Sequence, residues 1–309
     1  MSYASTVLAD SPVIFLQLDE TSGTSAADSG SNGVAWTYQT GVTLGVTAPF
    51  SVGGTAINPP GTTPAAVLST PPASVASPRG TSIEISVNIP TTSLKGEFVD
   101  LGNGSNGWSV GVGSGSFDTV GNNLIVLQEG AGWYDTGVQM GTGPHHVIVT
   151  NSTAGTISCY LDGTLVKTFT NAGSPSTATS FNLAGVGTRT LPATITVDNL
   201  AVYAAVLTQT QVTAHWDAIY VTLPYVAAEL SQLTLEVVST NPSPQRDLSS
   251  VSMLTLTAST SPPRQLSSAD MQVLTSSNPP RVLSSVFTEV LTPSYPKPKF
   301  IGWGLPISQ

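Results

Sequence analysis

The chain holds few side chains that could do acid–base or nucleophilic chemistry, because it has three histidines, one cysteine and only 9% charged residues. Glycoside hydrolysis needs two carboxylates that flank the scissile bond, but the segment Glu84–Asn88 offers a single carboxylate. His145 and His146 are adjacent, so in a strand their side chains point to opposite faces and do not form one catalytic unit. We expect one of them to pack in the core and the other to lie on the surface. The sequence therefore predicts no catalytic residues and no enzymatic activity.

Two short segments that place aromatic side chains beside glycines are candidates for ligand binding. Flat apolar rings can stack on sugar faces, while Asp and Asn side chains accept hydrogen bonds from hydroxyl groups. Both tryptophans also begin predicted strands, so packing in the core is the alternative for each. The candidate carbohydrate-binding residues are Asn106, Trp108, Trp133, Tyr134 and Asp135.

Charge divides the chain into two parts near Pro224. Residues 1–224 carry four basic and thirteen acidic side chains, whereas residues 225–309 carry five of each. Net acidity without a basic stripe argues against binding to nucleic acid. No apolar run reaches the length of a membrane span and no export signal begins the chain, so we expect no membrane insertion and assembly in a cytoplasm. The single Cys159 excludes an intrachain disulfide, and we expect it to be buried.

Abundant Gly, Ser, Thr and Pro residues predict an all-β protein with many turns. In 82–89, Ile83, Ile85, Val87 and Ile89 alternate with polar residues, which indicates a strand with one apolar face. Turn signals separate about ten such runs, at the spacing of a β-sandwich. The predicted strands are 13–20, 82–89, 98–101, 108–112, 124–128, 146–150, 157–161, 165–170, 180–183 and 193–203.

Two helices are expected at the ends of this first part. Residues 3–10 can form a short helix that is broken at Pro12. Thr208 and Gln211 have the spacing of a capping box at the start of the second helix. In that helix Val212, His215 and Trp216 would share one face.

A short sequence pattern is repeated four times between Leu230 and Leu291. Each copy begins with Leu-Ser, the starts are 18, 18 and 17 residues apart, and an alternating apolar run follows each start. Prolines close the first three copies. The copies begin at Leu230, Leu248, Leu266 and Leu283.

A strand with one apolar face cannot remain folded alone, because even a two-stranded hairpin is marginal in water. Proline-rich connectors favour extended backbone over tight hairpins. Each copy is therefore predicted to be a strand and a stiff spacer whose apolar face is covered by other copies, another chain or a sheet edge. A disordered Pro/Ser/Thr stalk is the alternative. The candidate assembly residues are Leu233, Leu235, Val251, Met271, Val286 and, as a terminal docking anchor, Trp303.

Three segments of the first part, taken in order, resemble LamG-like (concanavalin A-like) jelly-roll domains. They are Tyr3–Gly30, His145–Gly163 and Val197–Trp216. In the second segment Pro144 stands where the family usually has a tryptophan. The resemblance implies two antiparallel sheets packed face to face. The predicted fold is thus an all-β, concanavalin A-like jelly-roll β-sandwich with a C-terminal extended β-repeat tail.

The same resemblance implies that some relatives bind calcium near the aspartate of the closing strand, here Asp198, and near an early turn, here Asp28. Hard cations take several oxygen ligands, which Asp28, Asn32 and nearby carbonyl groups could supply. The alternative is that Asp198 caps a turn or accepts backbone amides. Calcium is the only cofactor we expect.

The C-terminal repeats resemble Ser-rich β repeats of bacteriophage virion proteins, especially minor tail proteins of phages that infect actinobacteria. The ending 297–306 is similar to the C-terminus of such proteins. We therefore expect a LamG-like domain over 1–224, a four-copy β-repeat assembly tail over 225–294 and a C-terminal docking peptide over 295–309.

These resemblances favour a non-enzymatic virion structural protein of the minor tail or fibre type, assembled in the host cytoplasm. Its partners would be other virion proteins, further copies of itself and a host cell-surface glycan that the lectin-like domain contacts. Two alternatives stay open: a head decoration or head-fibre protein, and a free carbohydrate-binding module with a Pro/Ser/Thr linker.

Overall fold

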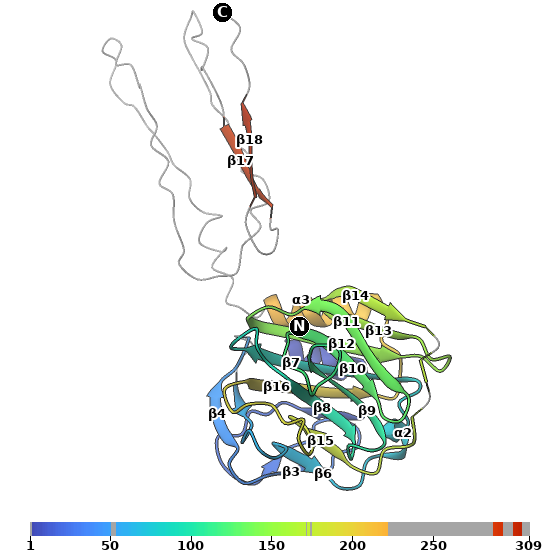
Figure 1. The fold of residues 1–309 in the computed structure, drawn as a ribbon. Helices are drawn as coiled ribbons and strands as arrows, with labels where there is room; N and C mark the ends of the chain where they lie inside the picture. Colours follow the sequence, from blue (N-terminus) through green and yellow to red (C-terminus); the bar gives the residue numbers. More distant parts are fainter. Residues whose placement is uncertain are drawn as a thin grey trace, which may run out of the picture. The chain divides into compact units, whose positions relative to one another are not determined.

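The computed structural model describes residues 2–50, 54–170, 172–173, 175–221, 287–292 and 299–304. The chain divides into two units, Met1–Leu235 and Glu236–Gln309. In the first unit two antiparallel eight-stranded sheets pack face to face (Figure 1). This confirms the expected all-β sandwich.

The first sheet runs in the order β14-β13-β12-β7-β16-β5-β4, and β1 also pairs with β16. At its centre β7 pairs along its whole length with β12, and on its other side with β16. Its strands are β1 (Ile14–Leu16), β4 (Thr43–Thr47), β5 (Thr55–Asn58), β7 (Thr81–Ile89), β12 (Gly143–Asn151), β13 (Ile157–Leu161), β14 (Thr164–Phe169) and β16 (Thr196–Tyr203).

The second sheet runs in the order β11-β10-β9-β8-β15-β6-β3-β2. Its longest ladders join β8, β9 and β10, and the candidate site described below lies among the loops beside these strands. Its strands are β2 (Ser25–Ala26), β3 (Trp36–Tyr38), β6 (Ala66–Leu68), β8 (Gly96–Gly102), β9 (Gly107–Gly113), β10 (Asn123–Gln128), β11 (Gly132–Gln139) and β15 (Phe181–Leu183).

The main core lies between the two sheets. Trp36, Trp108 and Phe181 are among its largest fully buried side chains, and the rings of Trp36 and Phe181 lie 6.1 Å apart. Each such side chain contributes about 1.5–3 kcal/mol when it leaves water. Cys159 also lies in this core, as the sequence predicted.

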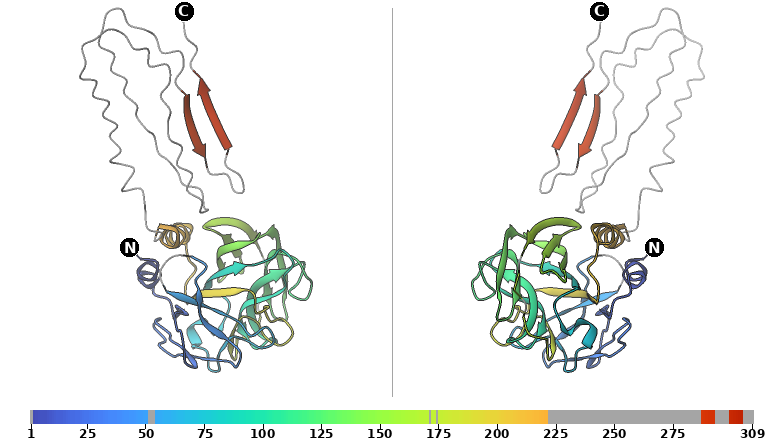
Figure 2. Two further views of the ribbon diagram at one scale, coloured as in Figure 1. Left: turned by 90° about the vertical axis from the view of Figure 1, so that its left-hand side faces the viewer. Right: turned by 90° about the vertical axis from the view of Figure 1, so that its right-hand side faces the viewer.

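Two helices, α1 (Tyr3–Ala9) and α3 (Gln209–Val221), contact each other and lie on the outer face of the first sheet (Figure 2). A second apolar cluster, which includes Phe15, Ile148 and Val212, fills the space beneath them. The capping box of α3 is confirmed, because Gln211 N–H donates to Thr208 Oγ1 and Thr208 N–H donates to Gln211 Oε1. A one-turn helix, α2 (Ala73–Ala76), precedes β7.

The central strand β7 differs from an ordinary one-sided strand. Its apolar residues face the main core as predicted, but its polar face is buried as well, including Ser82 and Glu84. The reason is that α1 and α3 cover this face and supply hydrogen-bond partners to it. Burial of both faces depends on distant segments, so alternation within the strand could not predict it.

Strands β2 to β6 were not expected from the sequence. The early strands are two to five residues long, too short to establish a pattern of alternation. Residues 132–139 form β11 at the edge of the second sheet, so the strand expected at Trp133 is present and also carries Tyr134 and Asp135. Among the described residues, no helix has the length and apolar character that a membrane crossing requires.

In the second unit, β17 (Phe287–Thr292) pairs antiparallel with β18 (Lys299–Gly304). The fourth copy of the repeat therefore contributes a strand, and Trp303 lies opposite Thr288 in the register. The expected assembly residues Leu233, Leu235, Val251, Met271 and Val286 lie outside the described residues.

The two tryptophans singled out above should differ in their effect on stability. Trp108 is fully buried in the core, so Trp108→Ala should lower the free energy of unfolding by about 3–5 kcal/mol. Trp133 is 37% exposed, so Trp133→Ala should lower the free energy of unfolding by much less. Urea unfolding of the two variants beside the wild type checks this difference. Equal losses would contradict the placement of Trp108.

Candidate functional site

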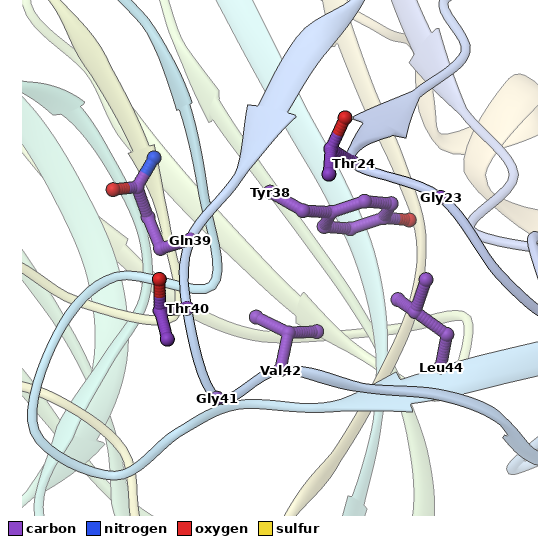
Figure 3. Close-up of a pocket in the computed structure, with 8 residues that line it drawn as sticks. All are labelled: Gly23, Thr24, Tyr38, Gln39, Thr40, Gly41, Val42 and Leu44. Carbon is purple, nitrogen blue, oxygen red and sulfur yellow. The ribbon is translucent and has the colours of Figure 1, made fainter.

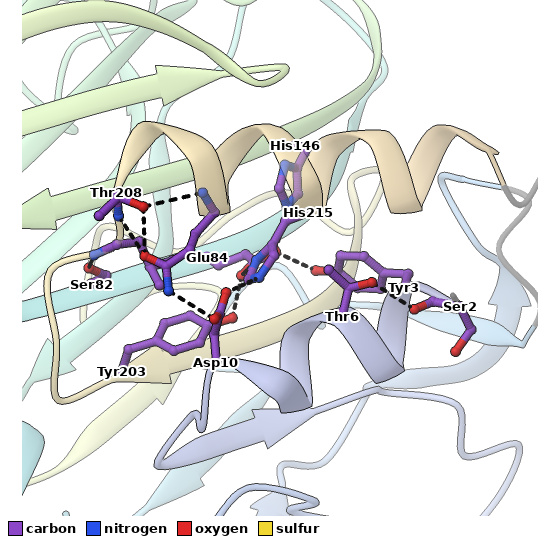
Figure 4. Close-up of polar contacts among 12 residues, drawn as sticks. Ser2, Tyr3, Thr6, Asp10, Ser82, Glu84, His146, Tyr203, Thr208 and His215 are labelled. Carbon is purple, nitrogen blue, oxygen red and sulfur yellow. Dashed lines mark hydrogen bonds and ion pairs between the residues drawn. The ribbon is translucent and has the colours of Figure 1, made fainter.

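A fully buried carboxylate, Glu84 at the centre of β7, accepts hydrogen bonds from four side chains. Tyr3 Oη and His146 Nε2 each lie 2.8 Å from Glu84 Oε1, while Tyr203 Oη and His215 Nδ1 bond to Glu84 Oε2 (Figure 4). A carboxylate offers about four acceptor positions, so those of Glu84 are saturated. The donors come from α1, β12, β16 and α3. We call these five residues the Glu84 network.

His215 extends the Glu84 network to a second carboxylate. Its Nδ1 faces Glu84, and its Nε2 lies 2.9 Å from Asp10 Oδ2 at the end of α1. Because carboxylates only accept, both ring nitrogens must donate, which defines His215 as an imidazolium. Burial lowers the pKa of His215, but the hydrogen bonds and charges of Glu84 and Asp10 outweigh it and raise the pKa above 6.5.

The charge of Glu84 is held in place by the same contacts. Burial alone would raise the pKa of Glu84, but hydrogen bonds and charge from His146 and His215 keep it well below its ordinary value of 4.5. Burial and the adjacent Glu84 charge raise the pKa values of Tyr3 and Tyr203. With Glu84 shut off from solvent, the network fastens α1 and α3 to the sheet and has no access to a substrate.

The second sheet carries a different group of charges on its outer face. Glu97 and Asp100 are three residues apart on β8, so in a regular strand they would point to opposite faces. The register shifts between Glu97 and Val99, a β-bulge. Phe98 and Val99 both pack in the core, and this turns the two carboxyls to one side.

Arg189, in the segment between β15 and β16, binds this acidic group. Its Nε lies 3.2 Å from Glu97 Oε1, and its Nη2 lies 2.6 Å from Glu129 Oε1. Asp100 accepts hydrogen bonds from Ser109 Oγ and Gly104 N–H, each 3.0 Å long. We call Glu97, Asp100, Glu129 and Arg189 the second-sheet cluster.

Three acids and one arginine leave the second-sheet cluster with an excess of negative charge. Burial raises the pKa of Asp100 to about 7, and burial together with the charge of Asp100 raises the pKa of Glu97 well above its ordinary value. Both carboxyls therefore hold a proton to higher pH than exposed acids do.

A surface hollow of 310 Å³ opens beside the second-sheet cluster. The loop 114–121 forms part of its wall, and Phe117 from that loop lies over β9, where a Cβ at Gly111 would come within 2.9 Å of its ring. Trp133 packs edge-on against Phe117 with 4.9 Å between ring centroids. The hollow is lined by Asn103, Gly104, Asp118, Val186, Gly187, Thr188 and Arg189. We call it the Arg189 hollow.

Another hollow, of 240 Å³, lies where β3 ends and β4 begins. In Figure 3 the Tyr38 ring lies between Thr24 and the pair Val42 and Leu44. The Tyr38 hydroxyl donates to Glu20 Oε2, and only 8% of the residue is exposed. Its ring therefore offers little flat surface for stacking, so the Arg189 hollow is the stronger candidate site.

The structure does not bring the five predicted carbohydrate-binding residues together as one exposed surface. Trp108 is buried in the core, and this corrects its candidacy as a ligand-binding residue. Asp135 is occupied as an acceptor for Gly115 N–H, Gly137 N–H and Asn123 Nδ2, and Asn106 bonds to Thr179. Tyr134 Oη accepts from Gly173 N–H, which leaves Trp133 as the exposed aromatic ring among them.

The predicted calcium residues occupy separate hydrogen-bonding environments. Asp28 Oδ1 accepts from Phe15 and Gly30 N–H, while Asp28 Oδ2, Asn32 Nδ2 and Asp198 Oδ1 are buried without a partner among the described residues. Burial and the charge of Asp19 raise the pKa of Asp198. Within the described ranges, His, Cys, Asp and Glu form no group of three or more suited to a metal. Calcium binding stays a prediction.

Several residues of both clusters were missed by inspection of the sequence. His145 and His146 were expected to divide between core and surface, yet both are buried, with His145 Nδ1 3.0 Å from Asp162 Oδ2. The pair Glu97 and Asp100 was missed because residues three apart point to opposite faces of a regular strand. Arg189 offered one signal in the sequence, because it is one of only four basic residues in 1–224.

Residues 60–213 match the family model of the concanavalin A-like lectin/glucanases superfamily. The match and the two antiparallel sheets together support a concanavalin A-like jelly-roll domain. No curated protein matches the sequence.

Several solved structures are similar in fold to about two thirds of this chain. The HCR/D F1240A mutant has a TM-score of 0.50 at 10% identity, over 67% of this chain and 51% of its own. The botulinum neurotoxin type G receptor-binding domain has a TM-score of 0.47 at 14% identity, and the match covers 67% of this chain and 51% of that domain's chain. A Trypanosoma rangeli sialidase in complex with sialic acid has a TM-score of 0.48 at 16% identity. The match covers 68% of this chain and 34% of the sialidase chain. This chain spans about half the length of the first two structures and about a third of the length of the sialidase. At these low identities, the similarity concerns the fold alone.

The Glu84 network predicts a dependence of stability on pH. Because the pKa of His215 is raised in the folded state, its contribution is complete below pH 6.5 and is lost as the pH rises through the folded value. The wild type should therefore exceed His215→Gln in free energy of unfolding most at pH 5–6, and the margin should shrink towards alkaline pH. Urea unfolding of both proteins across this range measures the margin. A margin that grows with pH would contradict the imidazolium assignment.

Proposed function

We propose that this chain is a non-enzymatic structural protein of a bacteriophage virion, of the minor tail or fibre type. Its concanavalin A-like domain faces outward and contacts a glycan on the host surface, and its C-terminal repeats hold it to other virion proteins and to further copies of itself. The glycan half of this proposal is supported by the lectin-like sandwich with the polar Arg189 hollow on its surface. The assembly half is supported by the four-copy amphipathic repeat in the sequence.

The absence of enzymatic activity is part of the proposal. General acid–base chemistry on a glycosidic bond requires carboxyls that reach the bond. Glu84, Glu97 and Asp100 all have exposures of 0%, and a substrate cannot contact them in this conformation. A role in binding agrees with this burial better than a role in hydrolysis.

The glycan half predicts binding without turnover. The full chain should bind polysaccharide from the host cell wall in a saturable manner on a biosensor surface, and it should release no reducing ends from that polysaccharide over hours. Heat-unfolded protein is the control for adhesion that does not depend on the fold. Release of reducing ends that stops in Glu97→Gln would contradict the non-enzymatic proposal.

The assembly half predicts a difference between two neighbouring substitutions. In the alternation of the first repeat copy, Leu235 lies on the apolar side and Glu236 on the polar side. Leu235→Asp should reduce self-association or incorporation into particles, whereas Glu236→Lys should have little effect. Light scattering after size separation measures the mass of each variant and of a chain truncated after Pro224.

The same measurement discriminates between the two readings of the C-terminal part. An oligomer that needs residues beyond Pro224 agrees with the virion proposal. A monomeric wild type that still binds glycan would instead favour a free carbohydrate-binding module with a linker, and so would equal tolerance of both substitutions.

A further inference from the structure

The Arg189 hollow contains a cation whose charge is already offset. Arg189 lies against two carboxylates, Glu97 and Glu129, and Asp100 adds a third carboxyl to the same cluster. Lys95 is the other cation close by, and its Nζ donates to the backbone oxygen of Asp118. The acids outnumber the bases around the hollow, so an anionic ligand would meet no surplus positive charge there.

Polar groups that line the hollow nevertheless remain available for a ligand. Arg189 uses Nε and Nη2 for its contacts within the protein, and Nη1 has no partner among the described residues. The carboxylate of Asp118 and the hydroxyl of Thr188 are exposed and likewise have no side-chain partner in that part of the chain. The hollow thus presents a charged donor, a charged acceptor and a hydroxyl together.

One wall of the hollow, the loop after β8, is held by hydrogen bonds within the protein. Gly104 N–H bonds to Asp100 Oδ2, and Asn103 Nδ2 bonds to Thr179 Oγ1, which holds the loop after β8. Gly104 has φ of +82°, and a Cβ there would lie 3.2 Å from Val186 and 3.3 Å from Arg189 Nη2, so glycine keeps the hollow open. Groups held in this way lose little conformational freedom on binding.

We infer that the Arg189 hollow binds one ring of a neutral sugar through two adjacent hydroxyl groups, which donate to Asp118 and accept from Arg189. Adjacent hydroxyls suit this arrangement because each can donate and accept, while the ligand adds no charge to an acidic region. The hollow of 310 Å³ is at the lower end of the range of about 300–1,000 Å³ for small-molecule sites, which suits a single ring. This inference rests on the proposed glycan-binding function and assigns its site and ligand class.

The test is a titration of the full chain, followed by NMR or calorimetry, with methyl glycosides of glucose, galactose, mannose and rhamnose. Glucuronic acid and N-acetylneuraminic acid serve as anionic probes at the same concentrations. At least one neutral glycoside should bind saturably, and both acids should bind at least about tenfold more weakly. Tighter binding of either acid would overturn the inferred ligand class.

Two substitutions locate the site. Asp118 lies in an exposed loop, so Asp118→Asn should leave the melting temperature unchanged. It should weaken binding of the neutral glycoside by about tenfold or more, because hydrogen bonds to charged groups are stronger than those to neutral groups. Thr24→Val, in the hollow of 240 Å³ beside Tyr38, is the matched control and should leave binding of the glycoside unchanged.

The outcomes separate the inference from the proposed function. If the wild type binds a neutral glycoside, but Thr24→Val weakens it and Asp118→Asn does not, the site assignment fails while glycan binding stands. If the wild type binds neither these probes nor host polysaccharide, the inference and the glycan half of the proposed function fail together.

Discussion

Burial of the Glu84 carboxylate is the constraint on which the arrangement of the first unit depends. An ionised carboxyl in the interior costs several kcal/mol unless its acceptor positions are filled. Four donors fill them, and they come from segments more than 200 residues apart in sequence, from Tyr3 to His215. The N-terminal and closing helices must therefore both be in place before the centre of the first sheet is satisfied. Removing one partner would leave a buried charge uncompensated, which makes docking of the helices cooperative.

The Glu84 network also explains why the two sheets have different roles. The centre of the outer face of the first sheet is covered by α1 and α3. Among the described residues, the second sheet carries no helix of comparable length, and its outer face holds the second-sheet cluster and a surface hollow. The first sheet thus binds the two helices through the Glu84 network, whereas the second sheet has polar groups beside a surface hollow. Both sets of charges are buried, but the Glu84 carboxylate is saturated with donors, whereas Glu97 Oε2 has no hydrogen-bond partner among the described residues.

Local patterns predicted those features that depend on neighbours in sequence. The capping box at Thr208 and Gln211 needs only its own turn, and the alternation of Ile83, Ile85 and Val87 needs only one buried face. Both were predicted and both are present. The orientation of Glu97 and Asp100 was not predictable, because a single extra residue in β8 reverses the expected facing. Trp108 likewise could be a sugar platform or a core residue until the opposite sheet was in place to bury it.

The sequence by itself determined that the chain is an all-β sandwich with a repeat-bearing C-terminal part, because alternation, turn residues and repeat spacing are local and additive. It also determined the overall acidity that argues against nucleic acid. Only the tertiary structure decided that Glu84, His146 and His215 form one buried network, that Arg189 neutralises part of an acidic cluster, and where the surface is hollowed. The physical reason is that the protonation and accessibility of a side chain are set by atoms close in space, and in this fold those atoms belong to segments far apart in the chain.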